Sequence, residues 1–259
     1  MNEFEKSLLK IIKEMYDLSD KEFRQVLMKY KTSRDNIIQF IAQLYILHSE
    51  DGILDYVYLD RIGAIKLFDN KVEEELKGVG VFEVSILTSI LGIISQQVYN
   101  KSAYQIEKYV KLNSPKQLGQ ISINKIIAFN WSGIPYSNRI KMNQQALRNS
   151  LKTTFVRSIQ DGDSIDKVAN KFKANFNSNA HQSNRLLLTE TARVIDQTQE
   201  KLYRQNKFTQ VEWVSALEQN TCMDCANLDG SVFNLDDLFR PRIPRHPNCK
   251  CTYLPYMDI

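Results

Sequence analysis

Glycine and proline are scarce in this chain until its C-terminal tail. The 259 residues include 9 glycines and 6 prolines, and four of the prolines follow residue 240. Because so few residues that break helices precede the tail, we expect long helices over most of the chain. With 43% apolar and 25% charged residues, the composition is typical of a globular protein and not of a disordered one.

The sequence also lacks the patterns of a signal peptide and of a membrane span. Its first residues, MNEFEKSLLKIIKEM, mix charged and apolar side chains as an amphipathic helix does. The most apolar stretch, residues 79–94, is short for a membrane span and contains Glu83, so we interpret it as a buried core helix. We therefore expect no membrane partner, and a reducing cytoplasm until the protein is assembled into something larger.

Acidic residues are nearly absent from one part of the chain. Residues 101–150 carry 8 basic side chains and one acidic side chain, whereas residues 1–100 carry 12 basic and 16 acidic ones. The formal net charge of +4 is therefore unevenly placed. Such a block predicts either an anionic partner or a solvated helical face, and the sequence leaves both open.

Residues 1–125 are predicted to form a helical N-terminal domain that contains no catalytic or ligand spacing. Apolar residues recur at helical spacing from Phe4 to Met15. Ser19 followed by Glu22 has the spacing of a capping box, which predicts that a second helix begins there. Further apolar runs at helical spacing lie near residues 36–48, 59–76 and 81–99.

Residues 126–259 are predicted to form a second domain, in which helices are followed by a short β tail. The expected helices run from Ser137 to the turn at residues 161–163, from Ser164 over a short stretch, and from His181 to Asn206. Residues Gln210–Leu217 alternate as a strand does, with Val211, Trp213 and Ser215 on one face. Asp229-Gly230 suits a tight turn between short extended segments.

All four cysteines lie in the last 38 residues, together with one of the three histidines. They form Cys222-x-x-Cys225 and, after twenty further residues, His246-x-x-Cys249-x-Cys251. Two donors separated by two residues can hold an ion from a single turn, and a second such pair completes a tetrahedron. Five candidates compete for four positions on one structural Zn²⁺ ion. We expect Cys225, His246 and Cys249 as ligands, with Cys222 or Cys251 as the fourth.

Other interpretations of the cysteines stay open. A disulfide such as Cys222–Cys251 would require an oxidising environment, and the thiols could also be free and buried. A redox motif is expected beside a βαβ pattern, which the sequence lacks. With the metal interpretation, the fold class is mainly α: a helical N-terminal half and an α+β C-terminal half that ends in a small zinc-knuckle-like β tail.

Three strings in the second half carry a family resemblance. WVSAL from Trp213, TCMDCANLDGSVF from Thr221 and PRHPNCKCT from Pro244 are similar to the C-terminal signature of the phage head morphogenesis (minor capsid) protein family, including its Mu F-like group. Upstream, WSG from Trp131 and TETARV from Thr189 also have counterparts there. The resemblance covers about residues 127–256 and leaves the N-terminal half unmatched.

The resemblance implies a function for the whole protein. Such proteins act in head morphogenesis at the portal vertex and in DNA packaging or delivery, without enzymatic activity. The implied partners are the portal protein and the capsid or scaffolding proteins, and the implied location is the virion. Two alternatives remain: a zinc-containing nuclease or toxin-like enzyme, for which the sequence has no catalytic motif, and a zinc-bearing DNA-binding protein.

Two further groups of charged residues have helical spacing, and neither predicts catalysis. Lys141, Arg148 and Lys152 differ by seven and four positions and share one face, which predicts either non-specific binding of double-stranded DNA or a solvated face. Glu190 and Arg193, at i and i+3, predict an ion pair on the helix surface or partly buried.

Overall fold

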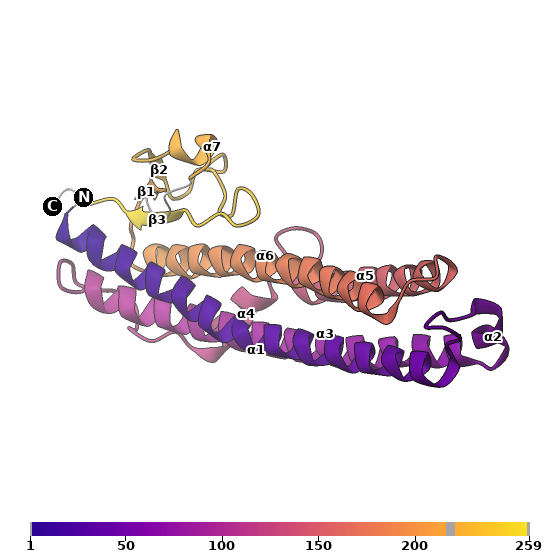
Figure 1. The fold of residues 1–259 in the computed structure, drawn as a ribbon. Coiled ribbons are helices and arrows are strands. Elements are labelled where there is room, and N and C mark those ends of the chain that lie inside the picture. The colour runs from indigo at the N-terminus through magenta and orange to yellow at the C-terminus, as the bar shows by residue number, and fades with distance from the viewer. Residues whose placement is uncertain (1, 216–220, 258–259) are drawn as a thin grey trace. The chain divides into compact units, whose positions relative to one another are not determined.

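The structure of this chain is a computed structural model that describes residues 2–215 and 221–257 (Figure 1). The described part is mainly helical, with a small sheet near the C-terminus, and this confirms the predicted fold class. The helices are α1 (Glu3–His48), α2 (Tyr56–Arg61), α3 (Ala64–Ile106), α4 (Gln120–Ala128), α5 (Tyr136–Gln160), α6 (Ile165–Gln205) and α7 (Met223–Ala226). The strands are β1 (Gln210–Val214), β2 (Val232–Asn234) and β3 (Thr252–Pro255).

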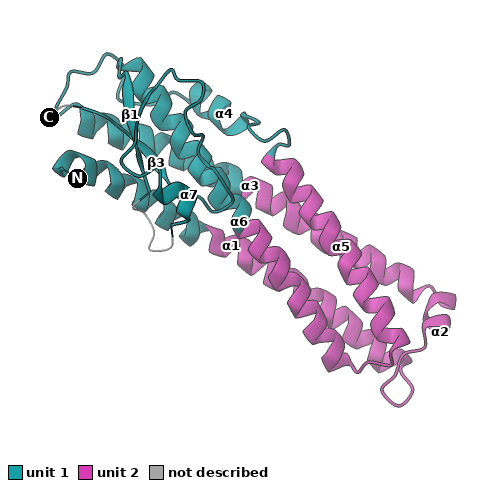
Figure 2. Ribbon diagram, turned by 90° about the horizontal axis from the view of Figure 1, so that it is seen from above, with its two compact units in different colours: residues 1–22, 87–135, 185–259 teal, residues 23–86, 136–184 magenta. Residues whose placement is uncertain are grey.

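The chain divides into two compact units that do not follow the order of the sequence (Figure 2). Unit 1 contains residues 1–22, 87–135 and 185–259, and unit 2 contains residues 23–86 and 136–184. Helices α1, α3 and α6 each contribute residues to both units. The predicted division into residues 1–125 and 126–259 does not coincide with these units, and it stays a prediction.

Two predicted helix boundaries are wrong, because the helices run through them. Ser19 lies inside α1 and is fully buried, and its hydroxyl is 3.2 Å from that of Thr191 on α6. A tertiary partner thus takes the side chain that the capping-box interpretation assigned to a helix start. The predicted break after the short helix from Ser164 is likewise absent, since residues 165–205 form one helix, α6.

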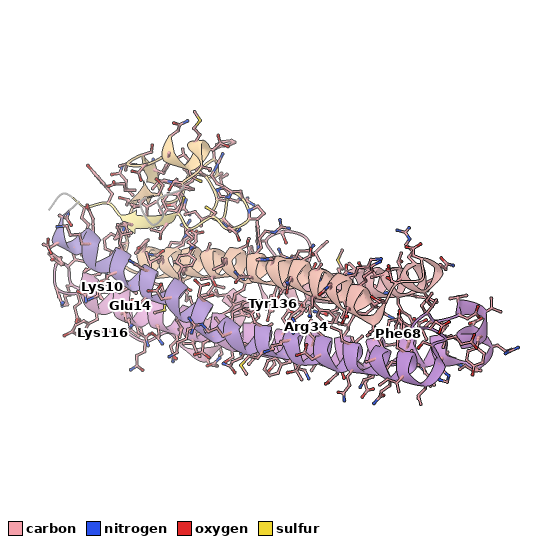
Figure 3. All side chains as sticks on the ribbon, in the orientation of Figure 1. Lys10, Glu14, Arg34, Phe68, Lys116 and Tyr136 are labelled. Atoms are coloured by element: carbon pink, nitrogen blue, oxygen red, sulfur yellow. The ribbon has the colours of Figure 1, made fainter. Side chains whose placement is uncertain are left out.

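In unit 2, the predicted apolar stripe of α5 faces the core. Leu147, Leu151, Phe155 and Ile159 are all buried. The ring of Phe68 from α3, labelled in Figure 3, stacks on Phe155 with the ring centroids 4.0 Å apart. Helix α5 ends at Gln160, and the positive φ of 65° at Gly162 allows the chain to turn back. The apolar periodicity of this segment was therefore sufficient to predict its packing.

The small sheet belongs to unit 1 and has the order β2-β1-β3, with both pairs antiparallel. Strand β1 ends at Val214. The predicted strand extended to Leu217, and its residues Ala216 and Leu217 lie outside the described residues. The predicted inner face of Val211, Trp213 and Ser215 is buried. The Tyr203 hydroxyl of α6 donates to the backbone carbonyl of Tyr253 on β3 at 3.2 Å, so the sheet is tied to α6.

Helix α3 is long and apolar enough to cross a membrane, by length and composition alone. Its 43 residues include a window with a mean hydropathy of 1.8, and 39% of that window is buried inside the structure. Core helices of soluble proteins pass the same test, so this observation is weak support for a membrane span.

Candidate metal centre

Two loops of unit 1 bring the cysteines and His246 together. Cys222 lies at the start of α7 and Cys225 lies within it, whereas His246, Cys249 and Cys251 precede β3. Because β3 pairs with β1 along four residues, the loop before β3 is returned to the side of the loop that follows β1. The antiparallel pairing of β1 and β3 therefore brings together the two ligand pairs that the sequence pattern predicted to share an ion.

The donor atoms of these residues lie at distances that suit a shared ion. The Nε2 atom of His246 is 3.2 Å from the sulfur of Cys222 and 3.4 Å from that of Cys225. Two groups have all their donor atoms within 4.8 Å of one another: Cys222, Cys225 and His246, and Cys225, Cys249 and Cys251. Donors on a tetrahedral metal with bonds of about 2.3 Å are about 3.8 Å apart, so both groups fit such an ion.

The cysteine thiols shift one another's pKa values, because they are close together and hydrogen-bonded. A hydrogen bond from the Cys251 thiol lowers the pKa of Cys249 to about 5, and that same bond raises the pKa of Cys251. Burial and a hydrogen bond to Cys222 raise the pKa of Cys225 to about 12, and the backbone amide and thiol of Cys225 lower the pKa of Cys222. Without a cation, the four sulfurs thus share protons between thiol and thiolate. A divalent ion would allow all of them to ionise.

His246 is oriented as a metal ligand would be. Its Nδ1 atom lies 2.9 Å from the carbonyl oxygen of Pro247, and this hydrogen bond is the main cause of its raised pKa. If Nδ1 carries the proton and donates it to that carbonyl, Nε2 keeps a lone pair directed at the sulfurs of Cys222 and Cys225. This arrangement fixes both the tautomer and the orientation of the ring.

A small cavity of about 20 Å³ lies inside the cluster. Cys222, Cys225, His246 and Cys251 contribute to its wall, whereas Cys249 does not. That volume is about the space of one water molecule, which leaves room for an ion but not for a substrate. All four cysteines are free thiols in the structure, and three of them, Cys225, Cys249 and Cys251, are buried.

The structure groups the predicted ligands differently from the sequence. Cys225 belongs to both groups of donors, while His246 and Cys249, which we expected in one set with it, fall into different groups. Which four of the five candidates bind a metal stays a prediction. A supporting contact from α6, in which the backbone amide of Asn248 donates to the hydroxyl of Thr189 at 3.2 Å, was not predicted, because no spacing in the sequence indicates it.

The turn that follows α7 has the structure that its sequence predicted. Gly230 has a positive φ of 75°, and its amide donates to the carbonyl of Trp213 at 2.9 Å. The carboxylate of Asp229 accepts a hydrogen bond from the amide of Ser215 at 2.7 Å. Asp229-Gly230 therefore closes the connection from β1 to β2 and stabilises the backbone beside the cysteines.

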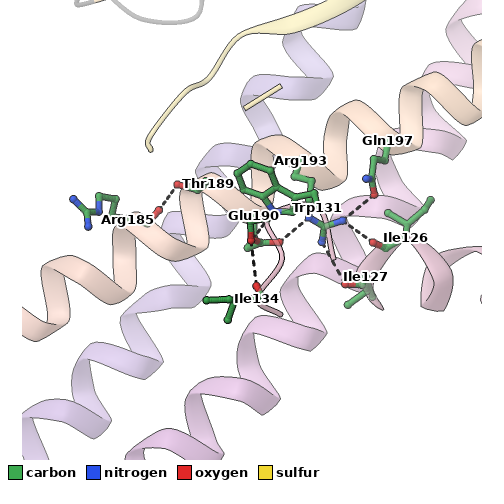
Figure 4. A network of polar contacts seen from close by, with 10 residues as sticks. Ile126, Ile127, Trp131, Ile134, Arg185, Thr189, Glu190, Arg193 and Gln197 are labelled. Carbon is green, nitrogen blue, oxygen red and sulfur yellow. Dashed lines mark hydrogen bonds and ion pairs between the residues drawn. The ribbon is translucent and has the colours of Figure 1, made fainter. Parts of the chain in front are cut away.

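A buried ion pair ties α6 to the segment around α4 in unit 1 (Figure 4). Arg193 Nε donates to Glu190 at 2.7 Å, and both residues are only 1% exposed. Arg193 also donates to the carbonyl of Ile126 at 2.7 Å, and the indole nitrogen of Trp131 donates to Glu190 at 3.0 Å. The predicted ion pair is confirmed, and it is more deeply buried than the spacing alone could indicate.

The predicted nucleic-acid face lies on α5, in unit 2, and carboxylates neutralise part of it. Arg148 pairs with Glu73 at 2.8 Å, and Lys152 pairs with Asp69 at 2.5 Å. For Lys141 we find no ion pair within the described part of the chain. The two acids of α3 reduce the charge available for phosphates, and DNA binding by this face stays a prediction.

The part of the chain that contains the metal centre is similar to a known protein family. Residues 149–254 match the family described as Phage Mu protein F like protein, which is less than half of the chain. The match includes all five candidate ligands and the whole of α6, and it confirms the resemblance predicted from the sequence. Neither a curated protein nor a solved structure matches this chain.

Proposed function

We propose that this protein, whose residues 149–254 resemble Phage Mu protein F and indicate a phage head protein, acts in head morphogenesis at the portal vertex. The proposed role includes DNA packaging or delivery and requires no enzymatic activity. Its partners are the portal protein and the capsid or scaffolding proteins, and its location is the virion, after assembly in the host cytoplasm. The family match over the C-terminal part of the chain supports these proposals, which extend beyond it.

The observation that carries the proposal at the level of residues is the convergence of five metal-ligand side chains from two loops. We propose that they hold one Zn²⁺ ion, with Cys225 as an obligatory ligand and with the other three drawn from Cys222, His246, Cys249 and Cys251. Zinc supplies a structural cross-link here, because four protein ligands would leave no position for a reacting water. The ion would fix the loops against a sheet of only three short strands.

The buried charges of unit 1 support a structural role over a catalytic one. Glu190 and Arg193 are fully engaged by each other and by Ile126 and Trp131, so they hold the chain around α4 against α6. A nuclease or toxin-like enzyme would instead need acids or a nucleophile presented to a substrate. That alternative, and a zinc-bearing DNA-binding protein, would be recognised by the outcome of the following test.

The test is co-expression of this protein with the portal protein of the same phage. We expect a complex that survives size-exclusion chromatography at micromolar concentration, and particles made without this protein that are defective in head assembly or DNA content. Separate elution together with normal particles would show that the assembly role is wrong. Cleavage of DNA by the purified protein, lost on chelation, would favour the enzyme instead.

A further inference from the structure

Unit 2 contains a groove between two of its helices. It has a volume of about 480 Å³, and its walls come from α3 and α5 alone. We call it the α3–α5 groove; it is lined by Glu73, Leu76, Lys77, Gly80, Val81 and Val84 of α3 and by Lys141, Gln144, Gln145 and Arg148 of α5. Figure 2 shows α5 and the part of α3 before residue 87, which carries the lining residues, in magenta.

The positions that line the α3–α5 groove have the spacing of a helix-packing face. On α3 they recur at three- and four-residue intervals from Glu73 to Val84, and on α5 they do so from Lys141 to Arg148. Two neighbouring helices that each present such a face leave a channel for a third helix to lie along. Eleven residues of helix span about 16 Å, so the groove accommodates about three turns of a partner helix.

The floor of the groove has an exposed apolar side chain. Val81 is 67% exposed, although it lies in the middle of a long helix whose neighbours Leu76 and Val79 are buried. At Gly80 the side chain of Gln144 on α5 packs closely against α3, since a Cβ atom there would be only 3.3 Å from Cγ of Gln144. An apolar side chain from a partner could therefore cover Val81 beside this close contact.

A buried polar group beside the floor is incompletely bonded. The amide nitrogen of Gln144 donates to Tyr30 at 2.5 Å and to the carboxylate of Glu83 at 3.1 Å. The amide oxygen of Gln144 is buried and has no hydrogen-bond partner among the described residues. An unpaired buried acceptor is costly, and a donor on a partner could satisfy it after a small movement of the side chain.

The charged residues of the groove favour a negatively charged partner. Lys77 and Lys141 lie on opposite walls, and neither forms an ion pair within residues 2–215 and 221–257. Arg148 is paired with Glu73, so the lining residues carry three cations and one anion, a net charge of +2. A partner with carboxylates on both sides of its apolar stripe would neutralise this excess from both walls.

We propose that the α3–α5 groove binds an acidic amphipathic helix of another protein. Its apolar face would cover Val81 and Val84, and its flanking Asp and Glu side chains would pair with Lys77 and Lys141. In this binding mode an amphipathic helix lies in a groove, and its apolar side chains at helical spacing contact the groove. The proposal is independent of the proposed role in head assembly, because it depends only on the chemistry of this surface.

The test uses synthetic helical peptides and the full-length protein, with binding followed by fluorescence anisotropy. The probe is a labelled peptide of about 18 residues, long enough to form helix, with leucines on one face and glutamates on either side. A second peptide has lysines in place of the glutamates, and a third has serines in place of the leucines. We expect only the acidic, leucine-bearing peptide to bind the wild-type protein.

Substitutions then locate the binding site. Val81→Glu places a charge on the apolar floor and should weaken binding at least about tenfold. The matched control Val57→Glu changes an equally exposed valine on α2, outside the groove, and should leave binding unchanged. The double variant Lys77→Glu, Lys141→Glu should reverse the preference, so that it binds the lysine peptide better than the glutamate peptide. Lys66→Glu is its control on α3, and circular dichroism should show unchanged helix content in every variant.

Several outcomes would overturn the proposal. These are an absence of binding at about 1 mM peptide, binding that is insensitive to Val81→Glu, and equal binding of the two charged peptides. A preference for a 20-base-pair DNA duplex that depends on the lysines but not on Val81 would identify the surface as a phosphate-binding face instead. Concentration-dependent dimerisation lost in Val81→Glu would show that a second copy of this chain fills the groove.

Discussion

At the scale of single residues, Cys225 occupies a position that none of the other four candidate ligands has. It belongs to both groups of donor atoms, it is almost fully buried, and its sulfur lies 3.4 Å from Nε2 of His246. Cys222, by contrast, is exposed and belongs to one group only. A metal bound by either group would therefore require Cys225, whereas one of the remaining four donors is dispensable.

Replacing Cys225 by Ser should remove the metal, because both groups of donor atoms include it. We expect about one zinc ion per chain in the wild-type protein, and less than about half of that in Cys225→Ser. Cys222→Ser is the matched control on the same turn and should retain more metal and a higher Tm. Mass spectrometry of the metal content and thermal unfolding under reducing conditions would measure both. Equal zinc in the two variants would contradict the assignment of Cys225.

Glu83 presents a second residue-scale feature, a carboxyl group buried in unit 2. It accepts hydrogen bonds from Tyr30 at 2.9 Å and from Ser183, and no basic residue forms an ion pair with it within the described chain. Burial raises the pKa of Glu83 above its ordinary value of 4.5. The folded state therefore holds this proton more tightly than the unfolded state does.

The raised pKa predicts a specific pH dependence of stability. The contribution of Glu83 to stability is complete below about pH 4.5 and is lost as the pH rises through the raised pKa, since the buried group must then ionise. Glu83→Gln cannot ionise, so its unfolding free energy should fall less than that of the wild type between pH 4.5 and pH 8. Urea unfolding at several pH values measures the difference. Glu74→Gln, at an exposed position of α3, is the control and should follow the wild type.

At the scale of elements, α6 links the metal-centre tail to the rest of unit 1 through polar contacts. Its hydroxyl groups meet Ser19 of α1 and Ser95 of α3, and its Arg193 bonds to the carbonyl of Ile126. These contacts lie among buried residues, where an unpaired hydroxyl or guanidinium would be costly. Helix α6 is therefore held in a defined register against its neighbours in unit 1.

Breaking the Glu190–Arg193 pair should destabilise the protein more than breaking a surface pair of the same spacing. Glu190→Gln leaves a buried guanidinium without its carboxylate, which costs about 3–5 kcal/mol. Glu3→Gln removes the carboxylate of the exposed i, i+3 pair with Lys6 and should change stability little. Replacing Glu190 by Gln and Arg193 by Met together should recover part of the loss. Denaturant unfolding would measure all three, and a loss for Glu190→Gln no greater than that of the control would contradict this role.

The apolar periodicity of the sequence predicted which face of a helix is buried, but not where each helix begins and ends. The buried stripe of α5 was predicted because its apolar residues recur every four positions, which depends on one helix only. The continuity of α1 was not predicted, because Ser19 carries a cap-like signal while its hydroxyl has a tertiary partner instead. The continuity of α6 was not predicted either, because the sequence was divided into one helix from Ser164 and another from His181, whereas only the first start, directly before Ile165, is a helix end.

The sequence predicted which residues are candidate ligands of the metal centre, but not which of them lie close together. The spacing of the cysteines and His246 indicated a shared ion, since donors two residues apart can converge from one turn. The relation of His246 to Cys222 and of Cys249 to Cys251 depends on how the loop before β3 returns beside β1. That return is set by strand pairing between residues about forty positions apart, which one sequence does not reveal.

At the scale of the whole molecule, the metal centre belongs entirely to one of the two compact units. All five candidate ligands and the three strands lie in unit 1, while α5, with its predicted nucleic-acid face, lies in unit 2. The sheet has only twelve residues in its strands, counted as five, three and four. An ion would thus contribute a large part of what keeps this tail folded, and little of what keeps unit 2 folded.

Removal of the metal should therefore open the tail selectively, and hydrogen exchange can resolve this. After chelation under reducing conditions we expect the amides of residues 209–215 and 221–256 to lose protection, because the loops that carry the ligands would be released and β3 would separate from β1. Amides of α5 should keep their protection, since the core around Phe68 and Phe155 contains no ligand. Cys225→Ser without chelator should reproduce the chelated pattern, which separates loss of the ion from side effects of the chelator. A uniform loss of protection through both units would show instead that the ion stabilises the whole chain, and unchanged protection everywhere would show that the tail does not depend on a metal.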